Sequence, residues 1–156
     1  MNQKNEIIGK KAGHYFDNGF HCAEAVAAAV LESFNENPSQ AIAHATAFGG
    51  GIGRSFDEVC GAISGALIAI GHLHGRQTRG EEWDIPAAFA QKIRQKFIDQ
   101  FKTTHCGTLR ERFGEERQSR ECSKLVEWVA QHLVEVLLNL CEKEIEPCFD
   151  KMDAVQ

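Results

Sequence analysis

The chain has 156 residues, of which 43% are hydrophobic and 25% are charged, and its formal net charge is -5. This is about the length of one domain, and it is long enough to bury a sizeable core. The mildly acidic balance argues against a dedicated nucleic-acid-binding protein, which needs a basic stripe. The low proline count, 3, argues against a disordered chain. We therefore expect one folded domain without a nucleic-acid partner.

The chain begins with MNQKNEIIGKKAG, which has neither the apolar segment nor the cleavage site of a secretory signal peptide. The apolar stretch that begins at Val59 is too short and too interrupted to span about 30 Å of hydrocarbon. We therefore expect a cytoplasmic protein without a membrane span. In that compartment cysteines stay reduced unless they perform redox chemistry or bind a metal, so the 6 cysteines of this chain are informative.

Apolar residues recur at helical spacing along most of the chain. The first predicted helix is expected between a cap at Asn18 and a stop at Asn37-Pro38. Its apolar stripe consists of Phe20, Ala23, Ala27, Val30, Leu31 and Phe34. A short helix is expected over residues 39–48, and the GGGIG run at 49–53 is typical of a turn.

A second long helix is expected to start at Ser55, because Ser55 and Glu58 match the capping box, and to run to about Leu73. It is apolar on nearly every face, which predicts a helix buried in the middle of the domain. Gly61 and Gly65 are four residues apart on one face, so a neighbouring backbone is expected to approach closely there.

The second half of the chain predicts two more long helices. The first is expected to be capped by Asp84. Its buried face carries Phe89, Ile93, Phe97 and Phe101. A charge-dense stretch over residues 105–121 predicts a loop or a short exposed helix. The final helix is expected to be capped by Ser119, and its stripe consists of Leu125, Val129, Leu133, Val136, Leu137 and Leu140.

No stretch of useful length shows the alternating pattern of a strand, and there is no repeat and no linker. The sequence therefore predicts an all-α, single-domain bundle of about five to six helices. Its core is expected over about residues 19–138, followed by an acidic tail over 142–156.

Four cysteines lie near predicted helix ends. Cys22, Cys60 and Cys122 each fall within about a turn of a helix start, and Cys106 falls just past a helix end. The first helical turn carries free N–H groups and a partial positive charge, which is expected to lower the pKa of a thiol. A thiolate is the nucleophile of disulfide exchange and also a ligand for soft metals. For each cysteine taken alone, burial in the core is the alternative.

The segment CGAISG at residues 60–65 resembles the C-G-A-x-x-G signature of the C_GCAxxG_C_C family, whose members are described as redox-active. That family has one characteristic cysteine before the signature, one in it and two after it. The cysteines of this chain fall in the same order: Cys22, Cys60, Cys106 and Cys122. The resemblance covers about residues 19–138 and implies a small helical protein with thiol redox or metal chemistry. Related split-Soret cytochromes carry haem and an iron–sulfur centre, but this chain has no Cys-x-x-Cys-His motif for covalent c-type haem.

Two chemistries are open if the four thiols converge. In thiol–disulfide exchange, Cys60 is the expected nucleophile, because the bare Gly61 beside it leaves access for a redox partner. In metal binding, all four thiolates hold an iron–sulfur cluster or zinc, with the Gly61 backbone close to the bound group. A third alternative is a non-catalytic helical binding module whose cysteines fill the core. The sequence does not identify the substrate or the electron partner, and a homodimer is a further alternative.

The remaining cysteines depart from the family pattern. Cys141 continues the stripe of the final helix and is expected in the core, whereas Cys148 follows Pro147 in the acidic tail and is expected to be exposed. Exchange between this pair and the main four cysteines is a further alternative. His21 and His105 each precede a family cysteine and are candidates for lowering a thiol pKa or for completing a mixed metal site.

Two other features of the sequence are candidate sites. The glycine run at 49–53 lacks the third glycine of a dinucleotide-binding loop and the Gly-Lys-Ser/Thr ending of a P-loop. It is therefore expected to bring backbone N–H groups beside the sulfur atoms rather than to bind a nucleotide. A group of arginines is expected on a solvated surface, with docking of an anionic partner as the alternative; it comprises Arg110, Arg112, Arg117 and Arg120.

Overall fold

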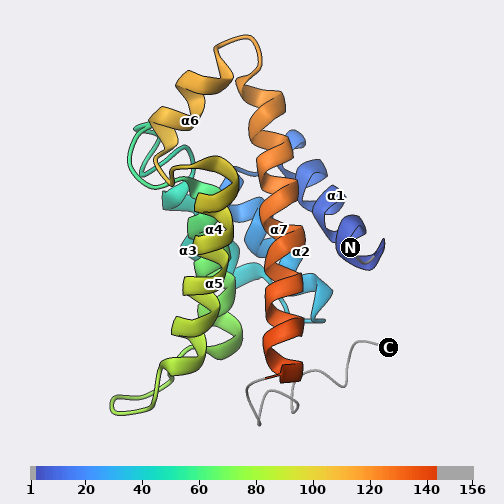
Figure 1. The fold of residues 1–156 in the computed structure, drawn as a ribbon, viewed down its shortest axis with the longest axis vertical. Helices are drawn as coiled ribbons and strands as arrows, with labels where there is room; N and C mark the ends of the chain where they lie inside the picture. The colour runs from blue at the N-terminus through green and yellow to red at the C-terminus, as the bar shows by residue number, and fades with distance from the viewer. Residues whose placement is uncertain (1–2, 144–156) are drawn as a thin grey trace.

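The computed structural model describes residues 3–143, with side chains described to residue 139 (Figure 1). This part of the chain folds into seven α-helices and one 3₁₀ turn, without a strand, which confirms the predicted all-α fold. The helices are α1 (Gln3–Asp17), α2 (Cys22–Ser33), α3 (Ser39–Ala45), α4 (Gly61–His74), α5 (Asp84–Phe101), α6 (Cys106–Phe113) and α7 (Gln118–Lys143), and η1 (Thr46–Phe48) is the 3₁₀ turn.

Helix α2 lies at the centre of the bundle. Every residue from Ala23 to Leu31 is buried, and α2 packs against α1, α3, α4 and α7. Five of these nine residues are alanines, whose short side chains let several helices approach one helix at once. The sequence predicted one apolar stripe here, whereas all faces of the helix are covered. Helix α4, expected in the middle of the domain, shares that position with α2.

The predicted start of α4 is wrong. The helix begins at Gly61, with Cys60 as its N-cap, rather than at Ser55. The Ser55 hydroxyl accepts a hydrogen bond from the backbone N–H of Asp57 at 3.2 Å within a loop. Glu58, expected in the first helical turn, has a φ of 55°, which a right-handed helix does not allow. The capping-box pattern therefore falls on a loop whose backbone is set by other contacts.

The expected close approach at Gly65 is confirmed. A Cβ atom there would collide with the carbonyl oxygen of Ala23, so α4 packs on α2 almost backbone to backbone. A similar contact joins α1 to α7, where a Cβ atom on Gly9 would lie 2.8 Å from the carbonyl oxygen of Glu127. Helix α1 was not predicted from the apolar pattern of the sequence. Its contact with α7, the most extensive in the fold, depends partly on glycines, which an apolar pattern does not reveal.

The other predicted helix starts lie close to the observed ones. His21, not Asn18, is the N-cap of α2, and Asp84 is the first residue of α5 rather than its cap. Ser119 lies in the first turn of α7, which begins one residue earlier. On α5, the expected apolar residues up to Phe97 are fully buried, and Phe101 is partly buried at the helix end.

Helix α6, the first turns of α7 and the loop that follows η1 lie together at one end of the molecule (Figure 1). The stretch around α6 was predicted as a loop or a short exposed helix. It is a short helix, and it buries Cys106 and Leu109 on its inner face. None of the described helices has the length and apolar character that a bilayer crossing requires.

Candidate functional site

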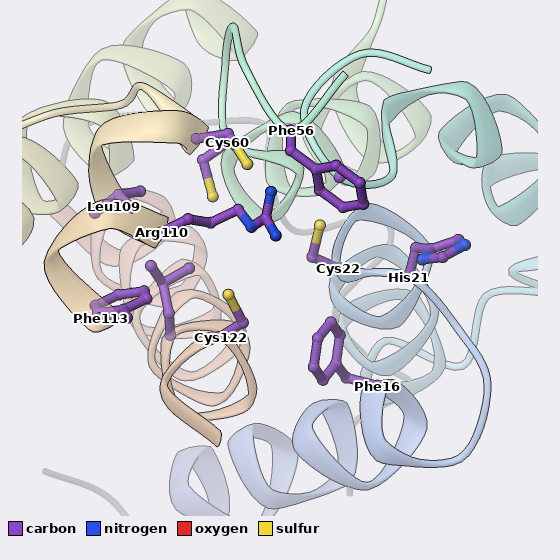
Figure 2. Close-up of a pocket in the computed structure, with 12 residues that line it drawn as sticks. Phe16, His21, Cys22, Phe56, Cys60, Leu109, Arg110, Phe113 and Cys122 are labelled. Carbon is purple, nitrogen blue, oxygen red and sulfur yellow. The ribbon is translucent and has the colours of Figure 1, made fainter. Parts of the chain in front are cut away.

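Four cysteines from four helices line one pocket at this end of the molecule (Figure 2). They are Cys22, the first residue of α2; Cys60, the N-cap of α4; Cys106, the first residue of α6; and Cys122, in the second turn of α7. All four are free thiols, and the cavity that they line has a volume of about 130 Å³. Helix packing thus gathers thiols that are far apart in the sequence.

A short antiparallel bridge between Val59 and His105 orients two of these cysteines. The N–H of Cys60 donates to the carbonyl oxygen of Thr104 at 2.7 Å, and the N–H of Cys106 donates to that of Glu58 at 2.7 Å. Successive side chains of extended backbone alternate between two faces. Cys60 and Cys106, which each follow a bridge residue, therefore lie on the same face of the bridge.

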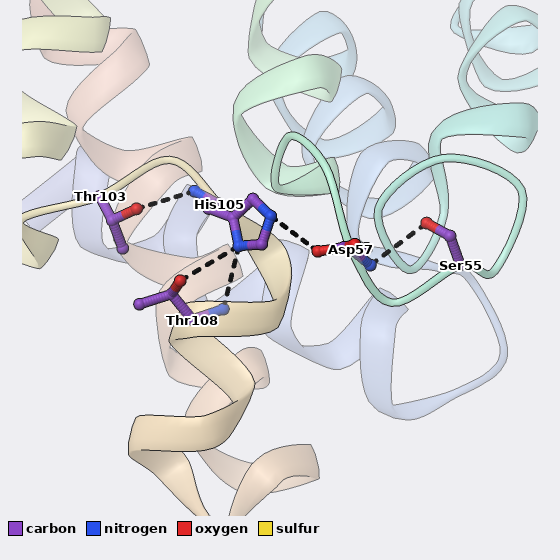
Figure 3. Close-up of polar contacts among 5 residues, drawn as sticks. All are labelled: Ser55, Asp57, Thr103, His105 and Thr108. Carbon is purple, nitrogen blue, oxygen red and sulfur yellow. Dashed lines mark hydrogen bonds and ion pairs between the residues drawn. The ribbon is translucent and has the colours of Figure 1, made fainter.

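A hydrogen bond between two side chains on the other face reinforces this bridge (Figure 3). The Nε2 atom of His105 lies 2.6 Å from Oδ1 of Asp57. The Nδ1 atom of His105 accepts the backbone N–H of Thr108 at 3.2 Å, which makes His105 the N-cap of α6. Because Nδ1 is an acceptor in this cap, Nε2 carries the proton that is donated to Asp57. His105 thus ties the loop before Cys60 to the helix that begins with Cys106.

Backbone N–H groups point at two of the sulfur atoms. The sulfur of Cys22 accepts hydrogen bonds from the backbone of Gly50 and Ala23, and that of Cys60 accepts them from Ala62 and Ile63. Except for the Gly50 group, these donors belong to first helical turns, and the N–H of Ile63 also donates to the carbonyl oxygen of Cys60 at 3.1 Å. Gly50 belongs to the glycine run, which was expected to bring N–H groups beside the sulfur atoms.

Gly61 has a different role from the one expected. A Cβ atom on Gly61 would collide with Sγ of Cys22 and with the carbonyl oxygen of Phe48. The bare glycine therefore makes room for the sulfur of Cys22 and does not leave an open approach for a partner beside Cys60.

The expected lowering of the thiol pKa values by helix starts is wrong for this pocket. Burial raises the pKa of Cys22, Cys60 and Cys106, and it raises the pKa of Cys122 to about 11. Charge repulsion from neighbouring thiolates adds to this effect at Cys60, Cys106 and Cys122. The backbone N–H groups act in the opposite direction at Cys22 and Cys60, but burial outweighs them.

Arg110 is a functional candidate that the sequence analysis placed on the solvated surface. Its guanidinium group points into the space between the labelled sulfur atoms (Figure 2). The group lies 3.9 Å from the centre of the Phe56 ring and donates two hydrogen bonds to Oε1 of Gln118, at 2.9 and 2.6 Å. Arg110 follows Cys106 by four residues, and this spacing, which places both on one helix face, was the available sequence signal. The other three arginines of the group are exposed, as expected.

The remaining walls of the pocket are mostly apolar. They include Phe16, Leu109, Phe113 and Leu125. His21 also lines the pocket, but its ring points away from the sulfur atoms (Figure 2). Its backbone N–H donates to Oε2 of the buried Glu24 at 2.7 Å. No group of three His, Cys, Asp or Glu side chains in the described part of the chain could hold a single metal ion.

Two cysteines of the sequence analysis are not placed relative to this pocket. Cys141 belongs to α7, but its side chain lies outside the described residues. Cys148 and the acidic tail also lie outside them. Exchange between these two cysteines and the four pocket cysteines stays a prediction.

A family model described as a putative redox-active protein (C_GCAxxG_C_C) matches residues 20–136. The chain belongs to this family. The matched residues include all four cysteines of the pocket. No curated protein and no solved structure matches the chain.

Proposed function

We propose that the four-cysteine pocket is a redox centre and that its thiolates hold an iron–sulfur cluster for electron transfer. The observation that carries this proposal is that four cysteines from four helices line one small cavity. Membership of a family described as redox-active supports a redox role. We also propose a cytoplasmic location, where such thiols stay reduced until they bind their cofactor.

The distribution of the sulfur atoms favours a cluster over a single metal ion. Zinc takes thiolate sulfurs at about 2.3 Å, so its ligands must converge on one point. No three ligand side chains among the described residues do so. A cluster contains several iron atoms, and its cysteine ligands are spread around it. Four cysteines arranged around a cavity of about 130 Å³ suit that second geometry.

The surroundings of the sulfur atoms also fit this cofactor. When bound, an iron–sulfur cluster supplies reversible one-electron oxidation and reduction. The backbone N–H groups at Cys22 and Cys60 donate hydrogen bonds to sulfur, which stabilises thiolate ligands. The apolar walls limit the access of water, and the Arg110 guanidinium supplies a positive charge against the thiolates.

Thiol–disulfide exchange is the second candidate, and the packing of Cys22 against the start of α4, beside Cys60, favours it. In this reaction a thiolate attacks the disulfide of a partner protein, and one partner sulfur leaves and takes up a proton. The second thiol then attacks the mixed disulfide, so the partner is reduced to a dithiol while Cys22 and Cys60 are oxidised to a disulfide. Burial disfavours this reaction, because the raised pKa values of both thiols leave little thiolate at neutral pH.

Anaerobic reconstitution of the full chain with ferrous iron and sulfide tests the proposal. We expect bound iron and sulfide, and a visible absorption that bleaches on reduction. Cys60→Ser should lose this absorption, whereas Cys141→Ser should retain it. Cys141 is a matched control, because it lies 19 residues after Cys122 on the same helix, about 28 Å along its axis.

A colourless, iron-free wild-type protein after reconstitution would overturn the cluster. A loss of two hydrogen atoms on oxidation, measured by mass spectrometry and mapped to a disulfide between Cys22 and Cys60, would then support thiol–disulfide exchange. Thiols that react with neither iron nor oxidant until the chain unfolds would leave the helical binding module as the correct interpretation.

A further inference from the structure

We infer that the cysteine pocket is selective for small anions and that Arg110, held in place by Phe56, determines this selectivity. The inference goes beyond the proposed function, because the charge preference of the metal-free pocket does not depend on redox chemistry there. It identifies the class of ligand that the pocket accepts, and it assigns a specificity role to two residues outside the cysteine set.

The permanent charge on the wall of the pocket is positive. Among the described residues that line it, Arg110 is the one with a permanent charge, and no carboxylate takes part. Its guanidinium group lies between the labelled sulfur atoms rather than in bulk water (Figure 2). A charge in a partly enclosed, mostly apolar cavity acts on a ligand more strongly than the same charge on an open surface.

Three helix starts add to this positive field. The first or capping residues of α2, α4 and α6 are all cysteines of the pocket, so the positive ends of three helix dipoles converge there. The helices have 12, 14 and 8 residues, respectively. The N–H group of Gly50 points into the same region, at the sulfur of Cys22. The helix dipoles add to the positive potential in the pocket, but Arg110 is the group of the described lining that carries a full charge.

Phe56 holds Arg110 in this position. Its φ is 54°, a left-handed conformation that bulky residues rarely adopt, and 46% of its surface is exposed. The ring packs against the guanidinium group at 3.9 Å, a cation–π contact, while Gln118 accepts its two hydrogen bonds. Such a backbone conformation persists only where the surrounding structure holds it, and the contact with Arg110 is part of that structure here.

Arg110 and Phe56 also separate this pocket from a second, outer cavity of about 410 Å³ that both residues line. The outer cavity contains Glu111 and Glu115. Asp57 and Glu121 raise the pKa values of Cys106 and Cys122, respectively, by charge repulsion, but neither residue lines the inner pocket, where Arg110 is the charged side chain of the described lining. A ligand that passes Arg110 meets a cavity with thiols and N–H donors but without acidic groups.

A pair of alkylating reagents tests this inference on the reduced, metal-free, full-length chain. Iodoacetate and iodoacetamide transfer similar groups to a thiolate, but the first is an anion and the second is neutral. Mass spectrometry gives the rate of each reagent at each cysteine. Because both reagents react with the same thiolate, the ratio of the two rates at one pH does not depend on the fraction of the thiol that is ionised. Arg110→Gln should lower this ratio at Cys106 and Cys122 about fivefold, the effect of one unit charge a few ångströms away in a solvated site.

Matched variants separate the charge of Arg110 from its packing. Arg112→Gln should leave the ratio unchanged, because Arg112 lies on the same helix but donates to the carbonyl oxygen of Phe101 at 2.8 Å. Arg110→Lys keeps the positive charge, so the ratio of the iodoacetate and iodoacetamide rates should stay close to its wild-type value. Phe56→Leu keeps an apolar side chain without an aromatic face, and it should lower the ratio partly.

Two results would overturn the inference. One is an equal ratio in Arg110→Gln and the wild type. The other is a native wild-type ratio equal to that of the urea-unfolded chain. If Arg110→Gln loses its helical circular dichroism, the salt dependence of the wild-type ratio decides instead. Added sodium chloride should lower the ratio by screening, and a ratio independent of salt would contradict it.

Inorganic phosphate distinguishes two sources of the negative charge. If the pocket takes a free anion, phosphate should slow the alkylation of Cys106 in the wild type but not in Arg110→Gln. Phosphate could also fail to slow the alkylation while the ratio of the iodoacetate and iodoacetamide rates still depends on Arg110. In that case the anion that Arg110 stabilises is a negatively charged cluster bound by the thiolates, not a free anion.

Discussion

Cys60 and Gly61 show how adjacent residues serve different parts of one site. Cys60 is only 6% exposed and presents its sulfur to the pocket from the N-cap of α4. Gly61 has no side chain, so the sulfur of Cys22 and the end of η1 fit against the helix start. The cysteine–glycine pair of the signature therefore has a packing explanation in addition to a chemical one.

Substitution of Gly61 by alanine tests this explanation at the residue scale. The added Cβ atom would collide with Sγ of Cys22 and the carbonyl oxygen of Phe48, so Gly61→Ala should destabilise the protein by about 1–3 kcal/mol. Gly71→Ala on the same helix is the control, because no atom lies within 4 Å of its Cβ position. That control should raise the free energy of unfolding by up to about 1 kcal/mol. Urea unfolding measures both, and equal effects of the two substitutions would refute the packing explanation.

The ionisation of Cys122 predicts how stability depends on pH. Burial, followed by the charge of neighbouring thiolates, raises its pKa from 9.0 to about 11 in the folded protein. The unfolded chain therefore ionises first, and the stabilisation, complete below about pH 9, is lost as the pH rises to about 11. The free energy of unfolding of the reduced, metal-free protein should fall over this window. In Cys122→Ser, the free energy of unfolding measured with urea should fall less over the same pH window. An identical dependence of this free energy on pH in the variant and the wild type would contradict the prediction.

At the scale of elements, apolar periodicity predicted where most helices exist but not where each one begins. The helix start at Gly61 depends on the bridge between Val59 and His105, a contact between distant segments that no local pattern encodes. Helix α1 was missed because glycines, rather than a broad apolar stripe, form part of its contact with α7. Contacts between distant segments therefore determine helix boundaries that the local sequence pattern does not predict.

The contact between Asp57 and His105 gives a prediction for the loop before α4 and for α6. Both side chains are largely exposed, so Asp57→Asn should change the free energy of unfolding by less than about 1 kcal/mol. It should nevertheless speed hydrogen exchange of the Cys106 amide, because this contact holds the bridge in which that amide donates to Glu58. Glu135→Gln, which removes the comparable pair with Lys96 on α5, is the control and should leave that amide unchanged. Unaltered exchange in Asp57→Asn would show that the bridge does not need this contact.

At the scale of the whole molecule, central helices α2 and α4 bring their starts to the same end as α6 and the beginning of α7. The family resemblance identified the four cysteines from the sequence, and their order along the chain was sufficient for that. The four-residue spacing from Cys106 could place Arg110 on the same helix face, but it could not predict that the guanidinium group lies between the sulfur atoms. That position depends on Phe56 in a strained loop and on Gln118 on another helix. The charge of the site is thus a property of the assembled fold.

Whether the four cysteines form one redox centre is tested by an alkylation footprint of all cysteines before and after anaerobic reconstitution with iron and sulfide. We expect Cys22, Cys60, Cys106 and Cys122 to lose their reactivity together on reconstitution and to regain it together when an iron chelator removes the metal. Protection of only some of these four cysteines, or of none, would contradict a single redox centre built from four helices.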